Sequence, residues 1–192
     1  LDAVNRASVP GLDALLNRPS AAALSPALRE ALLQRWQDAP GTHAPTAAWP
    51  VLADTLDALA LLSADDSALL AALLFDLPGL RSDLDALPLG SHKAAVVGLL
   101  DGLDAADQVW ALHAGRDAGR NSEGLRRLLL AIIRDLRVVP ILLARQLARM
   151  RAADKLDDEQ RRALAQLTRD IHAPLANRLG IWQLKWELED LA

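Results

Sequence analysis

The chain has 192 residues, of which 52% are hydrophobic and 24% are charged, and its formal net charge is −4. This profile excludes a disordered chain and a supercharged one. Cysteine is absent, which excludes disulfides, cysteine–zinc sites and thiol catalysis. No stretch approaches the roughly 20 apolar residues that span a bilayer, and no signal peptide is visible at the first residues. We therefore expect a cytoplasmic protein that makes no membrane contact.

Apolar residues recur at intervals of three and four, the period of an amphipathic helix, and no strand-like alternation appears. With many Ala and Leu and only 3% aromatic residues, this predicts an all-α fold, a single bundle of about eight to ten helices. Ser25 before Pro26 and Ser63 before Asp66 are the expected capping pairs of the first and third helices. In the first half of the chain, the predicted helices cover 26–37, 50–62, 63–77 and, as one or two helices, 91–112.

The longest apolar stripe, in residues 121–150, predicts a central helix of roughly 45 Å at 1.5 Å per residue. Pro140 lies inside this stretch. Because proline lacks the N–H donor, we expect it to kink the helix or to interrupt its hydrogen bonds.

Capping and breaking signals divide the C-terminal part of the chain. Asp157 and Gln160 resemble a capping box, which would begin a helix. Pro174 is expected to end that helix. A final amphipathic helix, 181–192, reaches the last residue without a stop signal. We therefore expect the chain to be cut within an element.

Charge is distributed unevenly along the chain. Residues 52–107 contain ten Asp against two basic residues, a local net charge of −8, whereas residues 116–151 contain nine Arg against three acidic residues, a local net charge of +6. One interpretation is that these are solvated helix faces, or an acidic face that meets a basic face within the domain. The other is an anion-binding surface on the long helix.

Local motifs identify no catalytic site. The sequence lacks a phosphate-binding loop, a dinucleotide-binding glycine motif and a nucleophile elbow. The four histidines, His43, His92, His113 and His172, lack the spacing of metal ligands, and we expect them at the surface or at a rim. The residues alone therefore assemble no active site.

One segment is far more specific than the rest. Residues 171–191 read I-H-A-P-L-A-N-R-L-G-I-W-Q-L-K-W-E-L-E-D-L. This closely resembles the signature that closes the N-terminal helical domain of the RelA/SpoT family, the enzymes that make and degrade the alarmone (p)ppGpp. Residues 71–75 and 128–139 also resemble the neighbouring helices of that domain, so the resemblance covers 24–192.

The resemblance implies a helical HD-domain fold. In bifunctional members of the family this domain is a metal-dependent hydrolase that removes the 3′-pyrophosphate. A His, a His-Asp pair and a distal Asp hold a divalent metal, usually Mn²⁺, and a Glu-Asp pair activates water. Such chemistry needs a cation that lowers the pKa of the water and neutralises phosphate charge.

The sequence departs from that pattern in its first half. Phe75 and Asp76 stand where the family has its His-Asp pair, and Gly79 and Leu80 stand where the Glu-Asp pair should follow. The family's first His falls near Val51, where this chain has no His.

The departure continues on the predicted central helix. Arg145 aligns with the distal metal-binding Asp, and Arg149 aligns with a nearby Asn. Of the metal ligands only Asp76 remains, and one carboxylate beside a guanidinium does not hold a divalent ion. The resemblance therefore implies a hydrolase site that binds no metal and no other cofactor, and has no catalytic residues.

These losses resemble the synthetase-only, RelA-type branch, in which a pseudo-hydrolase domain precedes a synthetase that transfers pyrophosphate from ATP to the 3′-OH of GDP or GTP. We expect residues 1–192 to be one silent regulatory domain, truncated before the synthetase domain, which is its expected partner. Ribosome contacts are expected from distal regions of the parent chain. We expect residues 1–192 not to bind nucleic acid directly. The alternatives are a residual or metal-independent (p)ppGpp hydrolase and a generic helical interaction module.

Two pairs of residues spaced by four deserve a structural test. Arg145 and Arg149 share a helix face. In the first hypothesis, the two arginines form an anion site that binds a regulatory nucleotide. In the second hypothesis, Arg145 pairs internally with Asp76 and fills the space of the metal. Trp182 and Trp186 lie partly off the apolar stripe of the last helix. We expect at least one of them to mark a surface that packs on the synthetase domain; otherwise both belong to the core.

Overall fold

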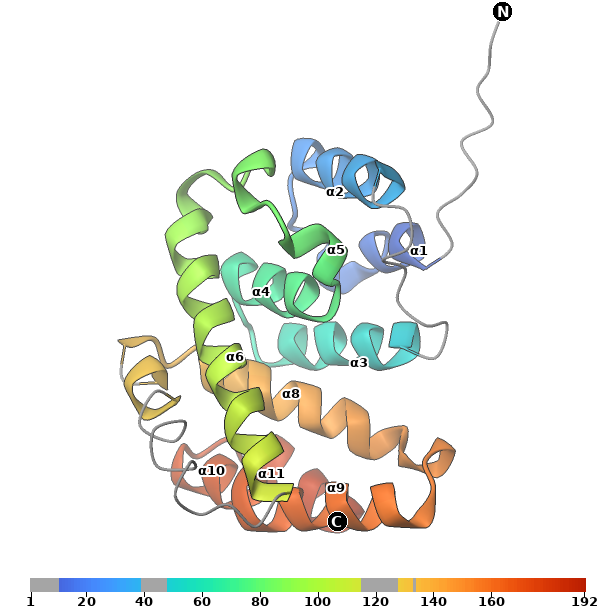
Figure 1. The fold of residues 1–192 in the computed structure, drawn as a ribbon, viewed down its shortest axis with the longest axis vertical. Coiled ribbons are helices and arrows are strands. Elements are labelled where there is room, and N and C mark those ends of the chain that lie inside the picture. The colour runs from blue at the N-terminus through green and yellow to red at the C-terminus, as the bar shows by residue number, and fades with distance from the viewer. Residues whose placement is uncertain (1–10, 39–47, 115–127, 133) are drawn as a thin grey trace, which may run out of the picture.

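The computed structural model describes residues 11–38, 48–114, 128–132 and 134–192, which form an all-α bundle without strands (Figure 1). The predicted fold class is confirmed. None of the described helices is long and apolar enough to cross a bilayer. The described residues contain ten α-helices: α1 (Leu12–Leu16), α2 (Pro26–Asp38), α3 (Ala48–Leu61), α4 (Asp66–Asp76), α5 (Pro78–Arg81), α6 (Lys93–Ala114), α8 (Val138–Arg151), α9 (Asp158–Leu167), α10 (Ala173–Arg178) and α11 (Trp182–Leu191).

The helix starts predicted for α2 and α9 are confirmed by their caps. The Oγ of Ser25 accepts a hydrogen bond from the Leu28 N–H at 3.2 Å. At α9, the Asp157 carboxylate accepts from the Gln160 N–H at 2.8 Å, and the Gln160 side chain accepts from the Asp157 N–H at 3.3 Å. These side chains satisfy backbone groups that a first helical turn leaves without partners.

The predicted cap of α4, Ser63, is wrong. Asp65 caps this helix, because its Oδ1 accepts the Ala68 N–H at 2.9 Å. Ser63 adopts φ 56° instead, a left-handed conformation that turns the chain between α3 and α4. The helix ends at Asp76, and Pro78, which needs no N–H partner, begins the short helix α5.

The predicted continuous helix over 121–150 is wrong in the part that the structure describes. The chain is helical over 128–132, but it leaves the helix at Asp135 and α8 begins only at Val138. The Asp135 carboxylate accepts the Arg137 N–H at 3.0 Å and binds its guanidinium, a local turn that competes with helix formation. Pro140 therefore falls in the first turn of α8, where its missing donor costs nothing.

Pro174 does not end α9 directly. The helix ends at Leu167, and a π-helical turn, Thr168–His172, leads into α10 with Pro174 in its first turn. A π-turn is a rare local widening of a helix that recurs at functional sites. Gly180, at φ 69°, then separates α10 from α11.

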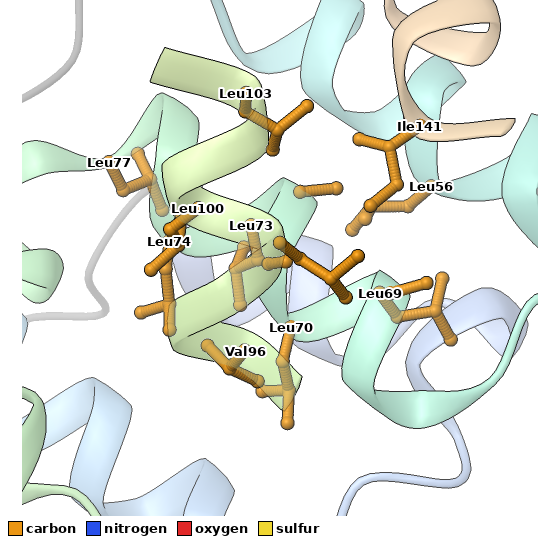
Figure 2. Packing of buried hydrophobic residues seen from close by; sticks show 14 of the residues in the cluster. Leu56, Leu69, Leu70, Leu73, Leu74, Leu77, Val96, Leu100, Leu103 and Ile141 are labelled. Atoms are coloured by element: carbon orange, nitrogen blue, oxygen red, sulfur yellow. The ribbon is translucent and has the colours of Figure 1, made fainter. Parts of the chain in front are cut away.

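The core lies between α3, α4, α6 and α8. Helix α3 packs mainly against α8, and α4 against α6. Figure 2 shows leucines of α4 and α6 meeting Leu56 of α3 and Ile141 of α8. A second cluster joins α8 to α10 and α11 through Val139, Leu143, Leu147, Ala176, Leu184 and Leu188. Helix α8 belongs to both clusters, so it is the element around which the rest of the bundle is arranged.

Acidic and basic helix faces meet where helices of the bundle pack together, at its partly exposed edges. At the N-terminal end of α8, Arg137 binds Asp65 at 2.6 Å, and at its C-terminal end Arg151 binds Asp54 at 2.7 Å. These contacts agree with the interpretation that an acidic face meets a basic one within the domain. Each is half-exposed, so each contributes little to stability by itself.

Candidate functional site

The positions that align with the family's hydrolase residues separate into two groups. Val51, Asp76, Arg145 and Arg149 line one cavity of about 240 Å³, together with Ala48, Trp49, Leu52, Thr55 and Leu77. The other aligned positions lie around it: Phe75 stacks against Arg145, and Gly79 and Leu80 of α5 are buried. The structure thus brings most of the predicted positions together, on α3, α4 and α8.

The centre of this site is an ion pair between α8 and the end of α4. Arg145 donates from Nε to one oxygen of Asp76 at 3.2 Å and from Nη2 to the other at 2.8 Å. Its guanidinium carbon lies 4.4 Å from the centre of the Phe75 ring. The Arg145 side chain is 9% exposed and that of Asp76 is 30% exposed. This is the geometry that the second hypothesis, an internal Arg145–Asp76 pair, expects.

The position of Asp76 explains why it requires a cation. It is the last residue of α4, where the helix dipole places partial negative charge and disfavours a carboxylate. Arg145 supplies the compensating charge, and its bidentate geometry is the strong form of such a pair. A second carboxylate, Asp107 of α6, approaches the Arg145 Nη1 to 3.7 Å, so α6 also contributes to the site.

These residues do not fit a divalent metal. Among the described residues, no three His, Asp or Glu side chains come close enough to share one ion. Both oxygens of Asp76 already accept from Arg145, and a guanidinium is a donor that repels a cation. The side chains of His43 and His113 lie outside the described residues, and His92 contacts Ser67 at 2.8 Å.

Arg149 differs from Arg145 although both lie on one face of α8. Its side chain is exposed, and no described carboxylate lies within ion-pair distance of it. Loss of hydration where the guanidinium lies against the protein lowers the pKa of Arg149, and the positive charge of Arg145 lowers it further. An arginine beside a second arginine gains from a bound anion, so the anion site remains a prediction that rests chiefly on Arg149.

The prediction that His172 lies at the surface or a rim is wrong. This histidine is 1% exposed, lies in the π-helical turn, and has its ring 5.0 Å from that of Trp110. Burial lowers the pKa of His172 to about 4, and the charges of Arg149 and Arg145 act in the same direction. The residue is therefore neutral at pH 7, and it lies close enough to Arg149 and Arg145 of α8 to be affected by their charge.

Sequence reasoning also missed Asp107 and Trp110 of α6. They are three residues apart, which places them on one helix face. Asp107 approaches Arg145 of α8, and the Trp110 ring lies against the ring of His172. Only that spacing could have indicated them, because nothing local to α6 identifies the helix that it faces.

The terminal helix is tied to the bundle by a cluster of charges. Arg151 at the end of α8 binds Glu187 of α11 at 2.6 Å and Asp54 of α3 at 2.7 Å. On the same helix Trp186 is 64% exposed, while the side chain of Trp182 lies outside the described residues. One of the two predicted tryptophans therefore stands on the surface, and its role in an interdomain contact remains a prediction.

Comparison with known proteins places this geometry in context. Residues 28–182 match the profile of a family described as "HD domain". The chain is 38% identical over 140 residues to a "GTP pyrophosphokinase" of Escherichia coli (strain K12), which covers 71% of this chain and 19% of that protein. It is 38% identical over 97 residues to a "GTP pyrophosphokinase" of Myxococcus xanthus, covering 50% of this chain and 13% of that protein.

A further relative carries a different name. The chain is 54% identical over 71 residues to a "Probable guanosine-3′,5′-bis(diphosphate) 3′-pyrophosphohydrolase" of Synechocystis sp., a match that covers 37% of this chain and 9% of that protein. The chain therefore spans less than a fifth of the length of each of these three relatives.

Proposed function

The chain belongs to the RelA/SpoT family of HD domains, and we propose that its domain is a catalytically silent, hydrolase-like regulatory domain of a (p)ppGpp synthetase. The parent activity would be transfer of pyrophosphate from ATP to GTP or GDP, as the resemblance to the RelA-type branch implies, and two of the relatives are named for GTP. Residues 1–192 would carry none of that chemistry themselves.

The observation that carries the proposal is the bidentate Arg145–Asp76 pair. Hydrolysis of this kind needs a cation with an open coordination position, which binds a water and lowers its pKa. A guanidinium has five N–H donors and no such position. Gly79 and Leu80 stand at the positions of the water-activating pair, and neither side chain can act as a base.

A hydrolase assay tests the proposal directly. The 192-residue chain is incubated with ppGpp and Mn²⁺, and released pyrophosphate is measured beside metal analysis of the dialysed protein. We expect release at the rate of the protein-free control and no bound manganese. Mn²⁺-dependent release, abolished by Asp76→Asn, would refute the silent domain and support the hydrolase.

That residual hydrolase is the second candidate, and one observation favours it. The relative with 54% identity over 71 residues is named a "Probable guanosine-3′,5′-bis(diphosphate) 3′-pyrophosphohydrolase", so part of this chain is similar to a protein named for that reaction. The two candidates separate on the release of pyrophosphate: a residual hydrolase releases it, with Mn²⁺ or, if it is metal-independent, without Mn²⁺, whereas the silent domain releases none.

The partner we propose for the regulatory role is the synthetase domain of the same chain. Trp186 supports this because a large ring at 64% exposure on the helix that follows Gly180 is costly to leave in water. Synthetase activity of the parent enzyme, measured with ATP and GTP, is expected to change when residues 1–192 are deleted, and also with Trp186→Ser. Unchanged rates in both variants would contradict a regulatory contact through this helix.

A further inference from the structure

A second, larger cavity opens beside the Arg145–Asp76 site. It is a groove of about 680 Å³ between the end of α8 and the length of α9, with Trp110 of α6 and Val51 of α3 completing its wall. This volume is within the range of small-molecule sites. The wall is mostly aliphatic, with Val51, Ala152, Leu156, Ala163, Leu164 and Leu167 forming it.

Four polar side chains reach this groove, and two of them are engaged elsewhere. The amide oxygen of Gln160 accepts the Asp157 N–H in the cap of α9, and the amide nitrogen of Gln166 donates to Asp170 at 2.8 Å. The others are the cations Arg149 and Lys155. The groove therefore combines an aliphatic wall with positive charge, and it has few free amide groups that could read the edge of a nucleobase.

The two cations at the groove make no direct ion pair with a carboxylate of the described residues, and Asp107 and Asp76 attract Arg149 only from a longer distance. Neither Arg149 nor Lys155 forms an ion pair with a described carboxylate, whereas the neighbouring Arg145 is paired with Asp76. Arg149 also lines the smaller cavity, so it stands where the two cavities meet. A carboxylate placed there would face an unpaired guanidinium, with which it can form two parallel hydrogen bonds.

We propose that this groove binds an amphipathic carboxylate, an aliphatic chain of about eight to twelve carbons that lies along α9 and Trp110, with its carboxylate on Arg149. The aliphatic wall favours the hydrocarbon part of the ligand, and the guanidinium of Arg149 favours its carboxylate. The proposal goes beyond the regulatory role and does not depend on it, because the groove is the same whether or not the adjacent site hydrolyses ppGpp.

Calorimetric titration of the 192-residue chain with octanoate, decanoate, octan-1-ol and GDP, all below micelle-forming concentrations, tests this. We expect decanoate to bind about tenfold more tightly than octanoate, because each added methylene contributes roughly a factor of three. Octan-1-ol should bind about tenfold more weakly than octanoate, since it lacks the charge that Arg149 pairs with.

Matched variants separate groove binding from nonspecific uptake. Arg149→Gln is expected to weaken octanoate about tenfold and to leave octan-1-ol unchanged, while the control Arg162→Gln, an exposed arginine of α9 outside the groove wall, keeps the wild-type affinity. Ala163→Phe should fill the groove and abolish binding of both; Ala163 is exposed, so the fold survives, which circular dichroism verifies. Equal octanoate affinity of Arg149→Gln and wild type, retained binding in Ala163→Phe, or binding of GDP without binding of decanoate would overturn the proposal.

Discussion

Replacing Asp76 by Asn removes the charge that compensates Arg145. The guanidinium then keeps only Asp107, at 3.7 Å, and the face of the Phe75 ring. Removing one partner of a fully buried ion pair costs about 3–5 kcal/mol. Because the Asp76 side chain is 30% exposed and Asp107 remains, we expect a loss of about 2 kcal/mol in the free energy of unfolding. Urea unfolding followed by circular dichroism should show a midpoint lower by about 1 M at unchanged slope.

The matched control is Asp85→Asn, which removes the partner of Lys93. Both side chains of that pair are more than half exposed, so solvent screens the pair and the urea midpoint should stay at the wild-type value. A double variant, Asp76→Asn with Arg145→Met, should lose at least about 1 kcal/mol less than the sum of the single losses. If Asp76→Asn unfolds at the wild-type urea concentration, or if the two substitutions are additive, then the pair does not hold α4 to α8 and the reasoning fails.

Four further variants test the rest of the structure, each by urea unfolding. Gly102→Ala should destabilise by about 1–2 kcal/mol, because a Cβ there would lie 2.8 Å from the Val138 side chain where α6 crosses the start of α8; a neutral result would mean that this crossing has room. Asp157→Ala should cost about 1 kcal/mol through loss of the α9 cap, and no loss would mean that water replaces it. Trp186→Ser should change stability by less than about 0.5 kcal/mol, since the ring is exposed; a larger loss would place the ring in the core. For His172, whose pKa is lowered from 6.5 to about 4, the unfolded chain takes up a proton between these values and the folded chain does not. Stability should therefore be full above pH 6.5 and fall by at most roughly 3 kcal/mol down to pH 4, and His172→Phe should flatten that part of the profile; an equally steep profile in the variant would assign the dependence to other groups.

Local signals in the sequence predicted the helices well where one side chain decides the outcome. Ser25 and the Asp157–Gln160 box begin their helices because each bond closes within a single turn. The failures occur where two local options compete. Ser63 and Asp65 both offer a capping oxygen, and backbone geometry, with Ser63 in the left-handed region, decides between them. Periodicity alone likewise could not show that the Asp135 carboxylate turns the chain before Pro140.

The site was harder to predict, because its parts come from distant segments of the chain. The Arg145–Asp76 pair could be anticipated as one of two alternatives, since a carboxylate left without a metal requires another cation. The contribution of α6 could not, because the position of Asp107 beside Arg145 follows from how α6 crosses α8 and not from any local pattern. The burial of His172 follows in the same way from the π-turn that sets its ring against Trp110.

The guanidinium of Arg145 supplies the positive charge that the family's site needs, but it cannot supply the chemistry of a metal ion. Structurally it does what a bound cation would do, because it neutralises Asp76 at the C-terminal end of α4 and holds that helix against α8. Chemically it is the opposite of a metal, because it is covalently anchored, never exchanges and presents only donors. On the silent-domain proposal, the contact between α4 and α8 needs no metal. Introducing Arg145→Asp alone should accordingly destabilise the domain without creating a metal site, since it sets two carboxylates against each other and leaves Phe75 and Val51 unable to supply the remaining ligands.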